Sequence, residues 1–224
     1  MNRYILFLFS FFTLSLSYSQ NLQMHYDFLE SNGTNRNMIT STIEMFKPDS
    51  IGSTFLFVDM NYSLKNSDVK LSYFEIARNF KSRISKFELQ LGYNGGNLIT
   101  ENNTGIHINP AFLMGINYPF QIKNVYFNSA LLYRYETSPS NSSNVHFTGL
   151  WFWNSKSKKI ILKGFIDIWT TSSERNLVIL SEPQCWYNIK YGYSIGSELE
   201  LSYGFVKLDK KLYFYPTIAL KYTW

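Results

Sequence analysis

The last twelve residues of the chain constrain its fold more than any other stretch. Tyr213 to Trp224 reads Y-F-Y-P-T-I-A-L-K-Y-T-W, and apolar side chains recur at alternate positions up to the terminal aromatic residue. Successive side chains of a β-strand point to opposite faces, so the pattern predicts a strand. Two environments fit it: the edge of a soluble sandwich, or the closing strand of a transmembrane barrel.

Similar alternation recurs along the whole chain and predicts about twelve strands. The segments are Leu22 to Phe28, Asn37 to Phe46, Ser53 to Tyr62, Val69 to Phe80, Lys86 to Asn94, Ile106 to Tyr118, Val125 to Glu136, Asn144 to Asn154, Lys159 to Thr170, Leu177 to Ile189, Ile195 to Val206 and Tyr213 to Trp224. An even number is typical of bacterial single-chain barrels. A sheet in lipid cannot leave an edge unpaired, so the last strand should pair with the first.

Composition favours a membrane barrel over a soluble sandwich. Aromatic residues make up 18% of the chain, yet the mean hydropathy is slightly hydrophilic at −0.16. Both follow if alternate side chains meet lipid and water. No window after the N-terminal segment holds the roughly 18 consecutive apolar residues that a spanning helix needs. The fold expected is therefore all-β, a transmembrane antiparallel up-and-down barrel in the bacterial outer membrane.

Connection lengths and aromatic positions support the same fold. The connections after odd-numbered strands include the longest, as expected for outer loops, and those after even-numbered strands are short, as expected for periplasmic turns. Aromatic residues gather at strand ends, as the girdles at two membrane surfaces would. The outer group is Phe28, Tyr62, Tyr93, Tyr135, Trp169 and Tyr203, and the inner group is Phe46, Phe80, Phe120, Trp153 and Trp224.

The N-terminus has the pattern of a secretory signal peptide. Arg3 precedes an apolar run from Tyr4 to Leu16, and small residues follow at Ser17 and Ser19. This order of charged, apolar and small residues is typical of a cleaved signal. We expect residues 1–19 to be removed and the barrel to comprise residues 20–224.

Charge and cysteine content exclude several classes of function. The formal net charge is +5, from 21 basic and 16 acidic residues that are spread along the chain without a basic block. Nucleic-acid binding is therefore not predicted. The single Cys185 cannot form an internal disulfide, and no Cys or His pair has metal-ligand spacing. We expect neither a metal nor another cofactor.

Some positions should interrupt the regular ladder. Pro110, Pro183 and Pro216 lie within predicted strands, where each removes a backbone donor, so local bulges or kinks are expected. The alternation within Val69 to Phe80 also changes phase after Tyr73. A bulge and a wrongly placed boundary explain that change equally well.

Several runs resemble an uncharacterised outer-membrane family related to the Tsx-type nucleoside-specific channels. They are E-M-F-K-P-D from Glu44, G-S-T-F-L-F-V-D-M from Gly52, F-E-I-A-R from Phe74, Y-N-G-G from Tyr93, S-E-P-Q-C-W-Y-N from Ser181 and G-S-E-L-E-L-S from Gly196. The resemblance spans nearly the whole mature chain. It implies a twelve-stranded barrel and passage of nucleosides or similar small solutes, but it carries no solute-binding residue over position by position.

If the apolar faces meet lipid, the opposite faces line a narrow lumen with aromatic residues and charges of both signs. Aromatic faces stack on planar rings, and carboxylates or amides bond hydroxyl groups. The candidate solute contacts are Phe55, Phe57, Asp59, Glu75, Glu88, Glu182, Gln184, Trp186, Glu198 and Glu200. The alternative is that such residues pair with one another to fill the lumen.

The function predicted is passive uptake of small polar solutes, with nucleosides as one candidate class. A structural barrel without transport and, with less support, a lipid-hydrolysing barrel remain alternatives. The three histidines lie outside any recognisable nucleophile motif, and His25 with Asp27 forms an i, i+2 pair without a nearby nucleophile. Expected partners are outer-membrane lipid, the barrel assembly machinery and the solute, and we expect a monomer.

Overall fold

The computed structural model describes residues 19–28, 30–31, 34–35, 37–64, 68–99, 104–137, 142–171, 177–205 and 210–224. The predicted signal peptide lies almost entirely outside these residues. Of the residues described, none belongs to a helix that could cross a bilayer. The strands are β1 (Ser19–Asp27), β2 (Glu30–Ser31), β3 (Thr34–Asn35), β4 (Met38–Asp49), β5 (Gly52–Ser63), β6 (Val69–Lys81), β7 (Glu88–Ile99), β8 (Gly105–Ile122), β9 (Val125–Glu136), β10 (Ser142–Asn154), β11 (Ile160–Thr170), β12 (Leu177–Ser181), β13 (Gln184–Asn188), β14 (Tyr193–Tyr203) and β15 (Leu212–Thr223).

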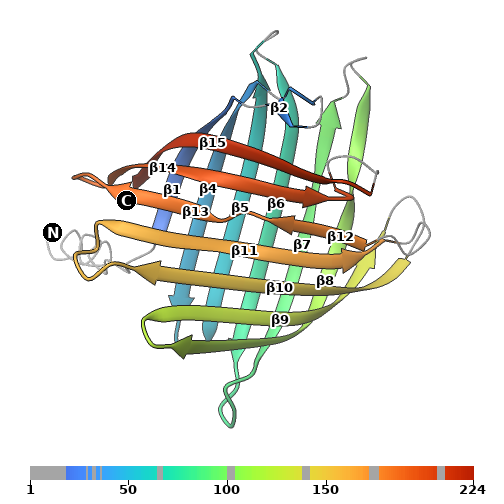
Figure 1. Ribbon diagram of the computed structural model, residues 1–224. Coiled ribbons are helices and arrows are strands. Elements are labelled where there is room, and N and C mark those ends of the chain that lie inside the picture. The colour runs from blue at the N-terminus through green and yellow to red at the C-terminus, as the bar shows by residue number, and fades with distance from the viewer. Residues whose placement is uncertain are drawn as a thin grey trace, which may run out of the picture.

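These strands form one closed antiparallel barrel (Figure 1). β1 pairs with β4 on one side and with the last strand, β15, on the other. Every other barrel strand also has a neighbour on each side, and β12 and β13 are two halves of one strand between β11 and β14. The barrel therefore has twelve strands, and β2 and β3 form a separate small hairpin in the first long connection. The sheets of a soluble sandwich would have unpaired edge strands. The closed barrel has none among the strands described, so the sandwich is excluded.

The alternation predicted for each strand is the observed one. On β1, Asn21, Gln23, His25 and Asp27 are buried while Leu22, Met24 and Tyr26 are exposed. Most large exposed apolar side chains of β7, β8, β9 and β15 follow the same outward parity, and the exceptions Leu98, Ile106 and Tyr126 lie at strand ends. The outer face is thus an apolar surface for lipid, because only lipid makes such exposure favourable around a closed barrel. The protein is therefore a transmembrane β-barrel.

The two rims differ as the connection lengths predict. The C-terminus lies at the rim with the connections 50–51, 82–87, 123–124, 155–159 and 189–192. The other rim carries 28–37, 64–68, 100–104, 137–141, 171–176 and 204–211. Short turns face the periplasm in such barrels, so the first group forms the periplasmic rim.

The expected interruptions occur at two of the three prolines. The β7–β8 register shifts between Asn94 and Gly96, which leaves one extra residue on β8 beside Pro110. Pro183 separates β12 from β13. The β14–β15 register runs through Pro216 without a shift, so the kink expected there is absent. The pairing of β15 with β1 ends at Thr217, and Pro216 lies just beyond it.

Other positions correct or refine the sequence interpretation. The irregularity in β6 lies near its start, opposite Asn61 and Tyr62, and not after Tyr73. Trp169 is not a girdle residue, because it pairs with His146, is 7% exposed and points into the barrel. Phe46 likewise shares the inward parity of Glu44, although it is 45% exposed. Cys185 is exposed on the outer face, opposite Leu162.

Candidate functional site in the barrel lumen

All ten candidate solute contacts have inward parity. The register pairs Glu44 with Phe57, Phe57 with Glu75, and Gln184 with Glu198. If one residue of such a pair points into the barrel, its partner on the next strand does too. Neighbouring residues across an antiparallel ladder point to the same side. The structure thus brings the candidates to one inner surface, whereas their role in binding a solute stays a prediction.

An ion pair crosses the lumen. Lys163 on β11 donates to both carboxylate oxygens of Glu44 on β4 at 2.8 Å, and Asn21 donates to the same carboxylate at 3.2 Å. Four barrel strands separate β4 from β11 on one side and six on the other, so the two residues come from nearly opposite walls. Their side chains are 20% and 18% exposed. The pair therefore narrows the path between the two rims.

Trp186 is the centre of a packed cluster on one wall. Its side chain is 0% exposed, and its indole N–H donates to Gln184 at 2.8 Å. The ammonium of Lys221 lies 4.1 Å from its ring centroid, and the His25 ring meets it edge-on at 5.9 Å. Gln184 in turn donates to Glu198. Both Trp186 and its polar partners are thus engaged within the wall and not presented to a solute.

The opposite wall, on β5, is more open. Phe55 and Phe57 are half-buried and stack on each other with centroids 6.3 Å apart, and Phe57 meets Tyr73 edge-on at 6.4 Å. Asp59 accepts a hydrogen bond from Thr42 on the neighbouring strand. Two rings and a carboxylate therefore lie along one inward stripe, as the sequence predicts.

The remaining candidates occupy different levels of the lumen. Glu75 interacts electrostatically with Asp167 from the far wall. Glu182 lies at the break between β12 and β13, and Glu200 faces Tyr215 on β15. Glu88 accepts a hydrogen bond from Asn117 at 2.9 Å, close to the periplasmic mouth. The ten candidates do not form one compact site.

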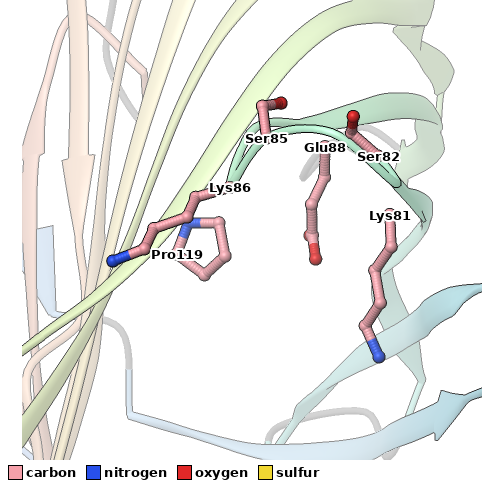
Figure 2. Close-up of a pocket in the computed structure, with 6 residues that line it drawn as sticks. All are labelled: Lys81, Ser82, Ser85, Lys86, Glu88 and Pro119. Atoms are coloured by element: carbon pink, nitrogen blue, oxygen red, sulfur yellow. The ribbon is translucent and has the colours of Figure 1, made fainter.

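A shallow pocket of about 240 Å³ opens at that mouth. Figure 2 shows Glu88 pointing into it, between Lys81 on one side and Lys86 with Pro119 on the other. Ser82 and Ser85 from the β6–β7 turn complete the lining. A solute that leaves the lumen on this side passes charges of both signs.

Sequence reasoning missed the polar network near the outer mouth. Arg134 donates to Glu136 at 2.8 Å, and its guanidinium lies 5.4 Å from the ring of Trp169. Trp169 stacks on His146 with centroids 5.5 Å apart. Parity alone identifies these residues as inward, but the cross-strand stacking has no signal in the sequence.

The arrangement around His146 does not form a catalytic relay. Its Nε2 lies 3.1 Å from Thr148 Oγ1 and 3.2 Å from Asp167, so one nitrogen meets both partners. A nucleophile relay needs the hydroxyl and the carboxylate on different ring nitrogens. Nδ1 of His146 is buried without a hydrogen-bond partner. Within the described ranges no group of His, Cys, Asp and Glu could hold a metal ion.

The inner face is rich in acid. Above the periplasmic mouth its carboxylates are Asp27, Glu44, Asp59, Glu75, Glu136, Asp167, Glu182, Glu198 and Glu200, and its basic side chains are Arg134, Lys163 and Lys221. At the mouth itself Glu88 is paired across the ladder with Lys81. This count covers the described strands only. The low-dielectric wall of the barrel concentrates the electric field of these excess carboxylates along the lumen.

A family model covers almost all of this barrel. It matches residues 19–224 and is described as a domain of unknown function, DUF5020. The chain belongs to this family. A search of curated protein sequences finds no match.

Solved structures of outer-membrane porins share the DUF5020 fold. The NanC porin matches with a TM-score of 0.57 and 8% identity, over 91% of this chain and 98% of that one. The KdgM porin in complex with disordered oligogalacturonate matches with a TM-score of 0.52 and 11% identity, over 92% and 99%. At these identities the likeness shows the barrel fold alone.

Proposed function

We propose that this barrel is a channel for passive passage of small polar solutes, and that it favours cations and neutral solutes over anions. The observation that carries the proposal is the acid-rich inner face around the Glu44–Lys163 pair. Rings of carboxylates select for cations in pores. The likeness to porins supports a channel role.

Nucleosides are the solute class that we propose first. The half-buried rings of Phe55 and Phe57 offer an apolar face to a planar base, and Asp59 beside them accepts hydrogen bonds from ribose hydroxyls. Trp186 is a weaker candidate, because Lys221 and His25 occupy its surface. The oligogalacturonate of the KdgM structure is an acidic polymer, and the acidic lumen of this chain disfavours such a solute.

The charge preference can be tested in planar bilayers. The purified mature barrel is inserted, and the zero-current potential is measured across a potassium chloride gradient. We expect a potential whose sign reports greater permeability for potassium than for chloride. Absence of conductance above that of protein-free bilayers would favour a structural barrel, and a chloride preference would contradict the proposal.

The solute class needs a second measurement. Swelling rates of vesicles that contain the barrel are compared for nucleosides, neutral sugars, amino acids and uronic acids of similar size. We expect nucleosides to enter fastest and with saturation. The same preparation incubated with phospholipid should release no fatty acid, because no hydrolytic relay is present among the lumen residues described.

A further inference from the structure

Basic side chains line the periplasmic rim from β6 to β14. Eight of them lie in or beside four of its turns and are all exposed: Lys81, Arg83, Lys86, Lys123, Lys156, Lys158, Lys159 and Lys190, here called the basic collar. The turns 82–87, 123–124, 155–159 and 189–192 hold no Asp or Glu. The collar is assembled by the fold, since its members come from hairpins far apart in the chain.

Nearby carboxylates offset only part of the collar charge. Asp49, at the remaining turn of this rim, is engaged by Arg78, which lies outside the collar, through contacts of 2.6 and 2.9 Å. Glu88 lies between Lys81 and Lys86 and accepts a hydrogen bond from Asn117. The collar therefore keeps a net positive charge along the part of the rim from β6 to β14.

Large apolar side chains accompany the basic ones. Ile84 is 97% exposed between Arg83 and Lys86, and Tyr191 is 88% exposed beside Lys190. An apolar group left in water beside a cation is unfavourable on a soluble surface. At a membrane surface both groups are satisfied, because the apolar part enters the lipid and the cation meets the headgroups.

An aromatic belt lies on the outer face directly next to the collar. Phe87 contacts Tyr118 with ring centroids 4.9 Å apart, and Phe120 stacks on Phe127 at 5.2 Å. On the other side of the barrel Tyr222 contacts Tyr193 at 4.9 Å and stacks on Trp224 at 5.8 Å. Aromatic belts mark the headgroup level of a bilayer. The collar therefore lies at or just beyond the headgroups of the periplasmic leaflet.

Three of these turn residues have a strained backbone conformation. Lys123, Lys158 and Tyr191 have φ values of 54°, 56° and 55°. Residues other than glycine, asparagine and aspartate rarely occupy this left-handed region. The chain thus keeps two lysines and a tyrosine at turn positions where glycine or asparagine would be less strained.

We propose that the basic collar binds the phosphate headgroups of anionic phospholipids in the periplasmic leaflet. The neighbours of the collar favour lipid over an acidic protein partner. The charges lie on four consecutive hairpins from β6 to β14, beside the exposed Ile84 and Tyr191 and next to the aromatic belt. A lipid surface accommodates this combination, because anionic headgroups attract basic residues while apolar side chains enter the bilayer.

Tryptophan fluorescence can test this binding. Trp151, Trp153 and Trp224 have outward parity in the periplasmic half of the barrel, whereas Trp169 and Trp186 face the lumen. The mature barrel is reconstituted in phosphatidylcholine that contains brominated phosphatidylglycerol or brominated phosphatidylcholine, which quench only nearby rings. We expect the anionic lipid to bind roughly fivefold more tightly, about the factor that one basic residue contributes beside an anionic surface.

A charge-removal variant and two controls make the test specific. The variant carries Lys156→Gln, Lys158→Asn, Lys159→Gln and Lys190→Gln; asparagine tolerates the positive φ at position 158. Its preference for the anionic lipid should fall clearly below that of the wild type, while the four collar charges that remain between β6 and β9 keep part of it. Arginine at the same four positions should keep the preference, and Lys210→Gln with Lys211→Gln on the opposite rim should leave it unchanged.

Two results would overturn the proposal. One is equal quenching by the two brominated lipids in the wild-type barrel, which is also what a collar made for an acidic protein predicts. The other is an unchanged preference in a charge-removal variant that is folded, as judged by its gel migration without boiling. Neither result bears on conduction, so the channel proposal stands or falls separately.

Discussion

Lys163 Nζ lies 2.8 Å from both carboxylate oxygens of Glu44, although 119 residues separate them in the sequence. The pair links nearly opposite walls of the barrel. Each side chain is about one-fifth exposed, so water reaches the pair from the lumen. An ion pair in this position controls both the width of the path and the local charge.

Removing one charge of this pair should shift ion selectivity in a direction set by the charge that remains. Glu44→Gln leaves Lys163 unpaired and should reduce the preference for potassium over chloride. Lys163→Gln leaves Glu44 and should increase it. Zero-current potentials of the two variants and the wild type give the comparison, and the double variant should return toward the wild-type value. A shift of the same sign in both single variants would show that the pair lies away from the ion path.

The stacked rings on β5 should control solute flux. Replacing Phe55 and Phe57 with Ala removes two side chains from the lumen wall, so conductance should rise while saturable nucleoside flux falls. Asp59→Asn should weaken nucleoside uptake without unfolding the barrel, because an amide still bonds Thr42. Vesicle flux measurements at several nucleoside concentrations check both effects. Unchanged saturation in both variants would mean that these residues only fill space.

Close packing against Trp186 gives a stability prediction. A Cβ added at Gly196 would lie 2.4 Å from the Cys185 carbonyl oxygen and 2.5 Å from the Trp186 ring. Gly196→Ala should therefore displace the Trp186 cluster and destabilise the barrel by about 1–3 kcal/mol. Gly105→Ala is the matched control, since a Cβ there meets nothing within 4 Å. Urea-dependent unfolding in lipid vesicles measures the difference, and equal stability of the two variants would contradict this packing.

The sequence predicts the strands and the side of the sheet on which each residue lies. Alternation alone predicts that Glu75, Glu88 and Glu200 point into the barrel, because successive side chains of a strand lie on one of only two faces. Alternation says nothing about which inward residues meet across the lumen. The Glu44–Lys163 pair depends on barrel closure and strand tilt, which no local pattern encodes.

The wrong placement of Trp169 has a physical origin. Its position near a strand end predicts the outer girdle, but the register with His146 directs its side chain inward. Position along a strand sets the membrane level of a residue, whereas parity sets its side. The basic collar is also not visible in the sequence. Its residues are scattered from Lys81 to Lys190, and only the fold brings them together at the rim.

The ion pair at the β4–β5 turn should persist in acid. Arg78 hydrogen-bonds Asp49 at the periplasmic rim and lowers the pKa of that carboxyl from 3.8 to about 2. A lowered pKa in the folded state means stabilisation above the unfolded pKa that is lost as pH falls toward 2. Asp49→Asn should therefore be less stable than wild type at pH 5 to 7, and the difference should shrink as the pH falls toward 2 and vanish only below it. Unfolding midpoints across this pH range check the trend, and a difference that does not shrink between pH 5 and pH 2 would assign the effect to packing.

Removing Trp224 should impair barrel assembly more than it impairs the stability of the finished barrel. In the folded state its backbone N–H donates to Gln20 at 3.1 Å and its ring stacks on Tyr222. The paired residues that close the barrel run from Asn21–Thr223 to Asp27–Thr217, so Trp224 adds only its one bond to Gln20 at the end of this ladder. We propose that the terminal aromatic residue guides the last strand into the assembly machinery. The amount of folded barrel in cell envelopes should fall several-fold, while the unfolding midpoint of the barrel that does fold should change little.

Trp224→Phe keeps an aromatic terminus and should restore the yield. A normal yield without Trp224 would show that assembly reads another part of β15.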